Sequence, residues 1–276
     1  MLINGENTEY VAVTDRGFQY GDGLFETIEV INGQPVFLKQ HLARLKAGCM
    51  ALKIPLSDNK PLIDEIDAVC KGSKRAVLKV MITRGSGGRG YRQPDNIEST
   101  RVISLHPFPD YPDINSQSGI IARFCETRLG LNPALAGIKH LNRLEQILAR
   151  AEWTDPAIQE GIMLDINNHV IEGTMTNLLY VKNSIIYTSS LKLSGVAGVM
   201  RHIINGLAIE QGFKLVEHDY GKEDLLAADE VFLCNSIIGI WPIKQLEQVN
   251  FKVGLVTKNL QKALQALKDQ EFANAR

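Results

Sequence analysis

The sequence lacks the features that mark several large classes of protein. Its four cysteines have no C-x-x-C spacing and no short-range pairing, so neither a zinc site nor a disulfide framework is indicated. Its charges nearly cancel, because 30 basic and 31 acidic side chains leave a net charge of -1. That balance gives no electrostatic reason to expect nucleic acid or an anionic membrane as a partner. We therefore expect small-molecule chemistry, with no metal ion and no nucleic acid.

Long apolar runs are also missing. The longest, residues 231–243, is interrupted by Asn235 and Ser236 and falls short of the roughly 20 residues that a spanning helix needs. The first residues, Met-Leu-Ile-Asn-Gly-Glu, lack the basic region and apolar core of a secretory signal. With 45% hydrophobic residues among 276, the chain can form one large domain or two modest ones. We expect a protein of the reducing cytoplasm with no membrane partner.

The first part of the chain predicts a sheet with one helix. Residues 26–31 and 34–37 read as two strands joined by a tight turn at Asn32-Gly33. Apolar residues at steps of three and four predict a helix, and they are Leu38, Leu42, Leu45, Cys49 and Leu52. Residues 76–83 and 101–105 are further strands.

A cluster of prolines and turn-forming residues at 107–116 interrupts this pattern. We place an interdomain linker at residues 108–118, between a small N-terminal α/β domain (1–107) and a larger C-terminal domain (119–276). The second domain is predicted to begin with a strand at 119–125 and a helix whose apolar face is Leu141, Leu144, Ile147, Leu148 and Ala151. Two hairpins follow, which turn at 167–168 and near 182–183. The last predicted elements are a helix at 199–211, a buried strand at 231–240 and a helix at 255–268. The fold class is mixed α and β.

Lys139 is the first candidate catalytic residue. It follows the apolar run Leu-Ala-Gly-Ile at residues 135–138, and partial loss of water lowers the pKa of a lysine from about 10.4. A neutral amine is a nucleophile, and an aldehyde is the obvious electrophile for it. Taken alone, Lys139 could equally be a surface lysine at the start of a helix.

Glu172 lies 33 positions later, in Glu-Gly-Thr-Met-Thr-Asn. A carboxylate against the pyridine nitrogen of pyridoxal phosphate keeps that nitrogen protonated, so that the ring can accept the electrons of a broken bond. Glu172 alone could be a solvated hairpin residue. Together with Lys139 it indicates an enzyme that uses pyridoxal phosphate.

Two stretches are candidates for binding phosphate. Gly198, Val199 and Met200 open a predicted helix, where amides and the helix dipole favour an anion, although the glycine could simply be a flexible helix start. Residues 85–90, Gly-Ser-Gly-Gly-Arg-Gly, satisfy the pattern of a dinucleotide site. That pattern requires a following helix, and Pro94 with no helical periodicity argues against one. We interpret residues 85–90 as a loop that carries Arg89 and Tyr91.

These motifs resemble those of the fold-type IV pyridoxal phosphate enzymes, a two-domain family that includes D-amino-acid and branched-chain aminotransferases and aminodeoxychorismate lyases. The resemblance covers nearly the whole chain, at residues 15–26, 41–45, 82–91, 135–146, 172–177 and 195–201. By this resemblance Lys139 binds the cofactor covalently and Glu172 contacts its pyridine nitrogen. Arg44 and Ser236 bind its phosphate, and Asn235 faces cofactor or substrate. Without the resemblance, Arg44 would read as a surface arginine beside an apolar helix face.

The resemblance also implies how substrate is held. In D-amino-acid aminotransferases the arginine matching Arg89 binds the substrate carboxylate from the neighbouring subunit, which implies a homodimer with shared active sites. Those enzymes have a tyrosine where this chain has Phe25, and its hydroxyl is absent here. Thr27 matches the threonine proposed to act on substrate in the lyases, although in a strand it could be only a β-former.

The motifs at 84–91 and 137–145 resemble the lyase members most. The expected activity is therefore the carbon–oxygen lyase reaction that converts 4-amino-4-deoxychorismate to 4-aminobenzoate and pyruvate for folate biosynthesis. A D-amino-acid or branched-chain aminotransferase of the same fold is the first alternative. A non-catalytic interaction protein that retains the fold is the second.

Overall fold

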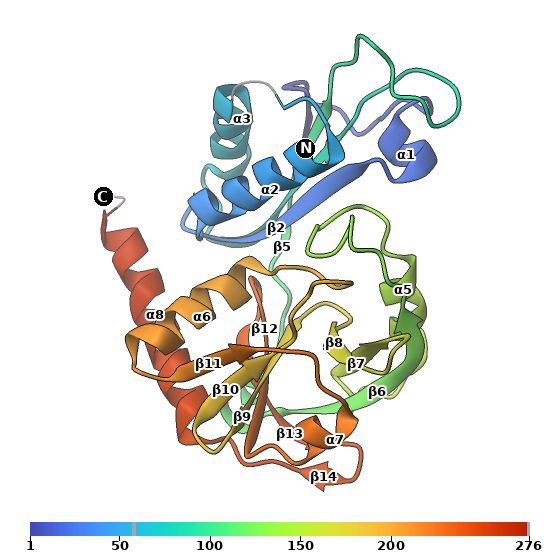
Figure 1. Ribbon diagram of the computed structural model, residues 1–276. Coiled ribbons are helices and arrows are strands. Elements are labelled where there is room, and N and C mark those ends of the chain that lie inside the picture. The colour runs from blue at the N-terminus through green and yellow to red at the C-terminus, as the bar shows by residue number, and fades with distance from the viewer. Residues whose placement is uncertain (57–58, 275–276) are drawn as a thin grey trace. The chain divides into compact units, whose positions relative to one another are not determined.

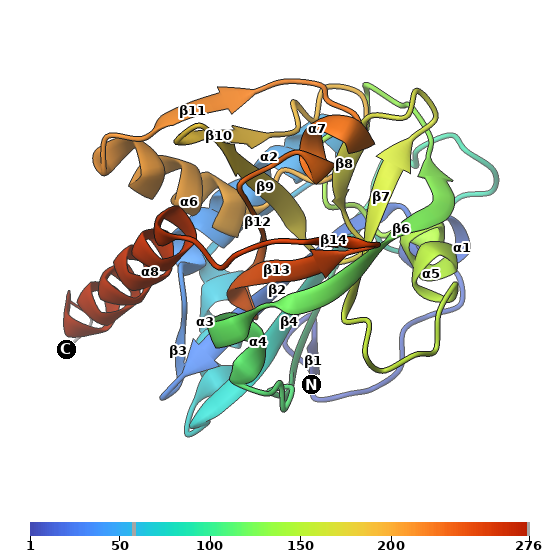
Figure 2. The same ribbon diagram turned by 90° about the horizontal axis from the view of Figure 1, so that it is seen from below.

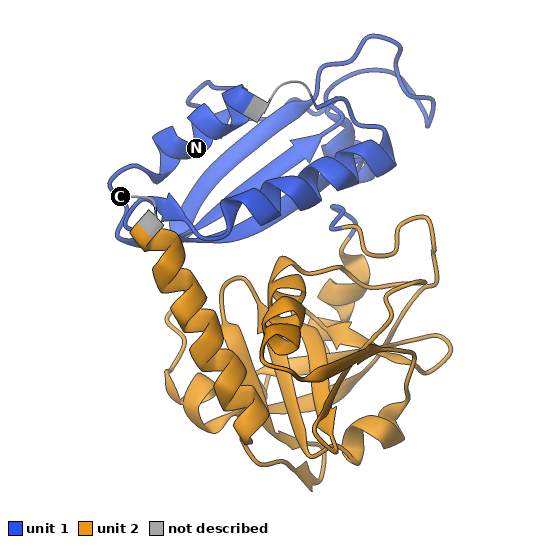
Figure 3. Cartoon of the chain, turned by 60° about the vertical axis from the view of Figure 1, so that its left-hand side comes forward, with its two compact units in different colours: residues 1–109, 139–142 blue, residues 110–138, 143–276 orange. Residues whose placement is uncertain are grey.

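The computed structural model describes residues 1–56 and 59–274. It divides into two compact units: unit 1 is Met1–Pro109 with Lys139–Asn142, and unit 2 is Asp110–Ile138 with Arg143–Arg276 (Figure 3). The step from unit 1 to unit 2 after Pro109 lies inside the range 108–118 that was expected for a linker. The domain limits themselves stay a prediction.

Unit 1 is built on an antiparallel sheet. In pairing order its strands are β1 (Leu2–Ile3), β5 (Thr100–Pro107), β4 (Arg75–Thr83), β2 (Gly23–Ile31) and β3 (Gln34–Pro35). The predicted hairpin of β2 and β3 is confirmed. It turns at Asn32 and Gly33, whose φ angles of 50° and 78° are the positive values that a tight turn needs.

Two helices pack against this sheet, α2 (Leu38–Leu52) and α3 (Asn59–Cys70), and the short helix α1 (Arg16–Tyr20) precedes β2. The predicted helix at 38–52 is confirmed as α2, which lies along β2 (Figure 1). Leu24, Ile28 and Val30 of β2 are at most 2% exposed, and burial of each such side chain contributes about 1.5–3 kcal/mol. Their alternation therefore determines which face of β2 meets the helices.

A short segment from later in the chain joins the edge of β2. The Phe25 N–H donates to the Lys139 carbonyl (3.1 Å), and the Leu141 N–H donates to the Gly23 carbonyl (2.9 Å). Residues 139–142 consequently belong to unit 1. The residue pattern did not indicate this pairing, because the two segments are far apart in the sequence.

Unit 2 contains a sheet that closes on itself. Its strands are β6 (Ile120–Leu129), β7 (Glu160–Asp165), β8 (Val170–Gly173), β9 (Asn177–Lys182), β10 (Ile185–Thr188), β11 (Lys214–Glu217), β12 (Glu230–Asn235), β13 (Gly239–Leu246) and β14 (Val249–Asn250). Eight of them pair in the order β11-β10-β9-β12-β13-β6-β7-β8, β8 pairs again with β9, and β14 pairs with β13. Glu172 and Asn177 make that closing pair.

The helices of unit 2 are α4 (Ile114–Ser118), α5 (Leu144–Arg150), α6 (Val199–Glu210), α7 (Lys222–Leu226) and α8 (Leu255–Asn274). The helices predicted at 199–211 and 255–268 are confirmed as α6 and α8, which lie side by side (Figures 1 and 2). The hairpins predicted at 167–168 and 182–183 join β7 to β8 and β9 to β10. Among the described helices, none has both the length and the apolar character needed to cross a bilayer.

The single strand predicted at 231–240 is wrong. That stretch is a hairpin of β12 and β13. Asn235 creates the turn, since its Oδ1 accepts the N–H groups of Ile237 (2.8 Å) and Ile238 (2.9 Å), and Gly239 follows with a φ of 65°. A side chain bonded to the backbone two and three residues ahead favours a turn over a continuing strand.

The helix predicted around residues 141–151 is shorter, because Leu141 pairs with the edge of β2 and α5 begins at Leu144. Its apolar face is also exposed: the exposed fractions of Leu144, Ile147 and Leu148 are 72%, 61% and 61%. Ala149, on another side of the helix, is fully buried. The three residues, spaced as one helical stripe, are called the α5 stripe below.

Candidate active site

Lys139 lies beside Phe25 in unit 1. Its side chain is half-buried, and its Nζ atom is 4.3 Å from the centroid of the Phe25 ring. The face of an aromatic ring attracts a cation. Phe25 and Thr27 alternate onto the same face of β2, and Thr27 pairs with Lys79 of β4. The structure therefore brings Lys139 to the sheet face that carries Phe25 and Thr27.

The other face of β2 carries a buried ion cluster of Glu26, His41 and Arg44. Glu26 is 1% exposed, and its carboxylate lies 2.6 Å from His41 Nδ1 and accepts from Arg44 Nε (2.8 Å) and Nη2 (2.5 Å). Burial alone raises the pKa of Glu26, but the bonds from His41 and Arg44 outweigh it, so that this pKa lies below its ordinary value. The pKa of His41 is lowered, mainly by burial. Sequence reasoning missed Glu26, although it interrupts an apolar alternation.

Glu172 lies in β8 of unit 2 and is 4% exposed. Its Oε2 accepts the Val196 N–H at 2.8 Å and lies 3.5 Å from Asn177 Nδ2. Asn177 Nδ2 also donates to the Val196 carbonyl at 2.8 Å. The carboxylate is therefore held from two sides against the segment that leads into α6. Sequence reasoning missed Asn177, whose signal is a polar residue that opens an apolar strand.

The same segment is bonded to the stretch before Lys139. Gly137 donates its N–H to the Gly195 carbonyl (2.9 Å) and accepts the Ala197 N–H (3.0 Å). Its φ of 80° suits glycine. The chain two residues ahead of Lys139 is thus tied to the segment that holds Glu172.

The start of α6 has the features of an anion site. Gly198 is its N-cap residue, in an extended conformation with no side-chain capping bond, and the first amides of a helix, here those of Val199 and Met200, have no acceptor within the helix. A Cβ at Gly198 would come 2.0 Å from Asn177 Oδ1, so the close approach requires glycine. Arg44, another predicted phosphate ligand, is bound in the ion cluster of unit 1. Both phosphate roles stay predictions.

A second carboxylate that the sequence reasoning missed, Glu160, holds the loop between β8 and β9. It is 1% exposed and accepts the hydroxyls of Thr174 (2.5 Å) and Thr176 (3.0 Å). Its other donors are the amides of Gly161, Thr174 and Met175. Burial raises the pKa of Glu160, and these neutral donors only partly oppose that rise.

Asn235 and Ser236 lie where β12 turns into β13. Asn235 Nδ2 donates to the Met175 carbonyl at 3.2 Å, which brings Asn235 to the loop that follows Glu172. Ser236 is half-buried in the turn. Their predicted contacts with cofactor or substrate stay predictions.

Arg89 and Tyr91 lie in the loop between β4 and β5, and both are exposed, Tyr91 to 88%. The Tyr91 ring contacts the ring of Tyr20 in α1, with centroids 5.7 Å apart. Residues 84–99 contain no helix, which agrees with the rejection of a dinucleotide site.

Comparisons with known proteins agree on one family. The family model for amino-transferase class IV matches residues 23–246. Aminodeoxychorismate lyase from Vibrio harveyi is 39% identical over 264 residues, which cover 94% of this chain and 97% of that protein. The crystal structure of 4-amino-4-deoxychorismate lyase from Pseudomonas aeruginosa matches with a TM-score of 0.93 at 45% identity, covering 96% of this chain and 98% of that one. Branched-chain amino acid aminotransferase from Escherichia coli matches with a TM-score of 0.84 at 26% identity, covering 96% and 92%.

These matches confirm the expected fold class and the expectation of an enzyme, with pyridoxal phosphate as its cofactor. The residues described above fit that cofactor. Lys139 offers a half-buried amine, Glu172 a buried carboxylate, and the helix start at Gly198 an anion site. When bound, pyridoxal phosphate supplies an aldehyde that reacts with amines and a protonated ring that accepts electrons.

Proposed function

Because the chain belongs to the amino-transferase class IV family of pyridoxal phosphate enzymes, we propose that it is an aminodeoxychorismate lyase. The reaction converts 4-amino-4-deoxychorismate to 4-aminobenzoate and pyruvate and supplies folate biosynthesis. The likeness to two such lyases across nearly the full length of all three chains carries the proposal. Phe25 also supports it, since it stands where D-amino-acid aminotransferases have a tyrosine.

The proposed reaction assigns a role to each side of the cofactor. Lys139 would hold the cofactor covalently, and its amine would remove the proton from C4 of the substrate. Glu172, fixed by the Val196 amide and Asn177, would hold the pyridine nitrogen and keep it protonated. Loss of the enolpyruvyl group makes the ring aromatic, so the protein needs only to start the elimination. Thr27 protonates the leaving group.

The phosphate is proposed to bind at the start of α6, to the amides of Val199 and Met200 beside Gly198. Arg44 and Ser236 complete this set, with Asn235 facing cofactor or substrate. Arg44 already balances the charge of Glu26. We therefore expect the amides of α6 to contribute more of the phosphate affinity than Arg44 does.

We also propose a cytoplasmic homodimer. We propose that a second copy of the chain covers the α5 stripe in this dimer, because three exposed apolar residues on one helix face favour burial by a partner. In that dimer Arg89 and Tyr91 hold a carboxylate of the substrate bound to the partner subunit. An Ile147→Asp variant is expected to elute as a monomer at concentrations where the unmodified protein is a dimer, as light scattering would record.

The activity is tested with purified protein and aminodeoxychorismate. Equal amounts of pyruvate and 4-aminobenzoate, formed with no keto-acid co-substrate, are expected. D-alanine with 2-oxoglutarate should react slowly at best; rapid transamination without aminobenzoate would assign the chain to the aminotransferases instead.

The cofactor link has its own test. Borohydride reduction should attach the cofactor to Lys139 and should attach none to a Lys139→Ala variant of unchanged fold. Attachment to another lysine would remove Lys139 from the proposed chemistry. A protein that stays colourless with added pyridoxal phosphate would favour the non-catalytic alternative.

A further inference from the structure

The loop between β4 and β5, which carries Arg89 and Tyr91, is fastened at its base by Asp15. This residue is 1% exposed, and its Oδ2 accepts the hydroxyls of Thr83 (2.8 Å) and Thr100 (2.7 Å), at the two strand ends from which the loop departs. Its Oδ1 accepts the Gly17 N–H at 2.7 Å. The base of the loop is thereby closed onto the turn that begins α1.

Arg16 reaches further, to the tip of the loop. It is 3% exposed, its N–H donates to the Gly85 carbonyl (2.9 Å), and its Nη1 donates to the Gly90 carbonyl (3.0 Å). Gly90 is the residue between Arg89 and Tyr91. The buried Arg16 guanidinium therefore binds the backbone between the two residues whose side chains are exposed, Arg89 and Tyr91.

Two further contacts hold the Arg16 side chain in place. Its Nε donates to Asp22 Oδ2 at 3.1 Å, and its guanidinium carbon lies 4.9 Å from the centroid of the Tyr20 ring. The Tyr20 ring in turn contacts Tyr91. Asp22 is shared with Arg84, which donates to both of its oxygens, at 2.6 Å and 3.0 Å. Arg16 thus belongs to a network with one end at the loop tip and the other at the end of β4.

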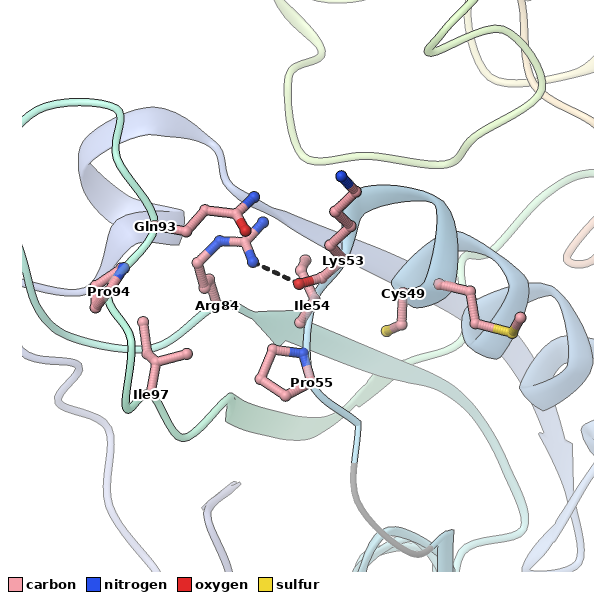
Figure 4. A pocket seen from close by; sticks show the side chains of 9 residues that line it. Cys49, Lys53, Ile54, Pro55, Arg84, Gln93, Pro94 and Ile97 are labelled. Carbon is pink, nitrogen blue, oxygen red and sulfur yellow. Dashed lines mark hydrogen bonds between the residues drawn. The ribbon is translucent and has the colours of Figure 1, made fainter.

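The later part of the loop lines a pocket. Gln93, Pro94 and Ile97 line a pocket of about 420 Å³ together with Arg84 and the C-terminal end of α2 (Figure 4). Glycine-rich chain has more conformational freedom to lose than any other. Polar contacts at specific points are therefore needed to give residues 85–92 one conformation, and the bond from Arg16 to Gly90 is the one nearest Arg89 and Tyr91.

We propose that Arg16 is a positioning residue for substrate, which acts by holding the Gly90 carbonyl and so directing Arg89 and Tyr91 toward a carboxylate of the substrate. This proposal rests on the proposed function, which assigns substrate binding to Arg89 and Tyr91. Its chemistry is specific to arginine, because one planar group must bind Asp22 through Nε and Gly90 through Nη1.

The test uses the holoenzyme with Arg16→Gln and Arg16→Lys, and with Arg92→Gln as a matched control. Arg92 is an arginine of the same loop whose side chain is 83% exposed and pairs only at the surface with Asp95. Hydrogen exchange of residues 85–92 is measured first, without substrate. In Arg16→Gln it should quicken by about tenfold or more, the usual loss when a charge-assisted hydrogen bond is removed. Arg92→Gln should leave it unchanged.

Kinetics with aminodeoxychorismate follow. In Arg16→Gln, KM should rise about tenfold while kcat changes less than about twofold and cofactor content stays at the level of the unmodified protein. Arg16→Lys keeps a charge beside Asp22 but cannot make both bonds. Its exchange rate and its KM should therefore fall between those of the unmodified protein and those of Arg16→Gln. It also serves as the test if Arg16→Gln does not fold.

Exchange at the unmodified rate in the Arg16 variants would overturn the proposal whatever the activity. Quicker exchange with unchanged KM would overturn it too, since Arg16 would then only stabilise the loop. Failure of the proposed function gives a different result: the unmodified enzyme forms no aminobenzoate, or Arg89→Ala leaves KM unchanged while the loop still loosens in Arg16→Gln.

Discussion

Glu26 and Glu160 are both 1% exposed, but their partners differ in charge. In unit 1, Glu26 faces the cationic guanidinium of Arg44 and the ring of His41, and its pKa is lowered despite burial. In unit 2, Glu160 faces hydroxyls and amides, and its pKa is raised by burial. Equal burial therefore has opposite consequences, because the hydrogen bonds and charges of His41 and Arg44 outweigh the lost hydration of Glu26, whereas the neutral donors of Glu160 do not outweigh its burial.

The two regions also serve different proposed parts of the enzyme. The cluster of Glu26 lies behind the strand that carries Phe25 and Thr27, whereas Glu160 holds the loop that follows Glu172. One region uses charge to fix a strand against a helix. In the region of Glu160, neutral hydroxyl and amide donors fix a loop.

The largest effect is expected from Glu26→Gln. It leaves the Arg44 guanidinium, whose side chain is 17% exposed, without its counter-charge, and breaking a buried pair in this way costs up to about 3–5 kcal/mol. Urea unfolding measures the loss. Adding Arg44→Met to Glu26→Gln should recover part of it. A loss below about 1 kcal/mol would show that Glu26 and Arg44 do not stabilise the fold as a pair.

Glu160→Gln is the matched change in unit 2 and should cost less, about 1–3 kcal/mol, because the amide keeps one acceptor oxygen and no charged partner is left behind. The same unfolding assay decides it. If Glu160→Gln destabilises the protein more than Glu26→Gln does, the contrast between charged and neutral partners is wrong.

Asn177→Ala extends the comparison to Glu172, which accepts from the neutral Val196 amide and also interacts electrostatically with the Arg143 guanidinium. It removes a bond to the Val196 carbonyl and the contact with Glu172, with an expected loss of about 0.5–1.5 kcal/mol in stability. Affinity for pyridoxal phosphate should fall with it, since Glu172 is then less fixed. Equal affinity in a titration followed by fluorescence would mean that Asn177 serves only the fold.

The smallest effect is a difference in pH dependence, with a slope of at most about 1.4 kcal/mol per pH unit for each carboxyl. The pKa of Glu26 is lowered in the folded protein, so its contribution is present above the unfolded pKa and is lost as pH falls through the folded pKa. The lowered pKa of His41 acts in the same direction. The pKa of Glu160 is raised, so its contribution is present below the unfolded pKa and is lost as pH rises through the folded pKa.

The stability difference between the unmodified protein and Glu26→Gln should accordingly shrink in acid, and the difference for Glu160→Gln should shrink toward neutral pH. Unfolding curves at several pH values measure both. Parallel trends in the two variants would contradict the opposite pKa shifts.

Local patterns were sufficient for much of the fold. The turn at Asn32 and Gly33, the helix over residues 38–52 and the helix over 199–210 depend on interactions within a few residues, and they were predicted correctly. The strand at 231–240 was wrong because one side chain, Asn235, outweighs the apolar run around it. The α5 stripe had the spacing of a core helix, but spacing does not say what covers a face.

The sequence by itself determined the chemistry of this protein. The motifs around Lys139 and Glu172 indicate a cofactor enzyme because amine and carboxylate are intrinsic to those side chains. Only the tertiary structure decided which polar groups are paired, as Glu26 with Arg44 or Asp15 with Thr100, because a buried group responds to atoms as far as 85 residues away along the chain. Charge belongs to a residue, whereas the local dielectric and the hydrogen-bond donors around it exist only in the folded chain.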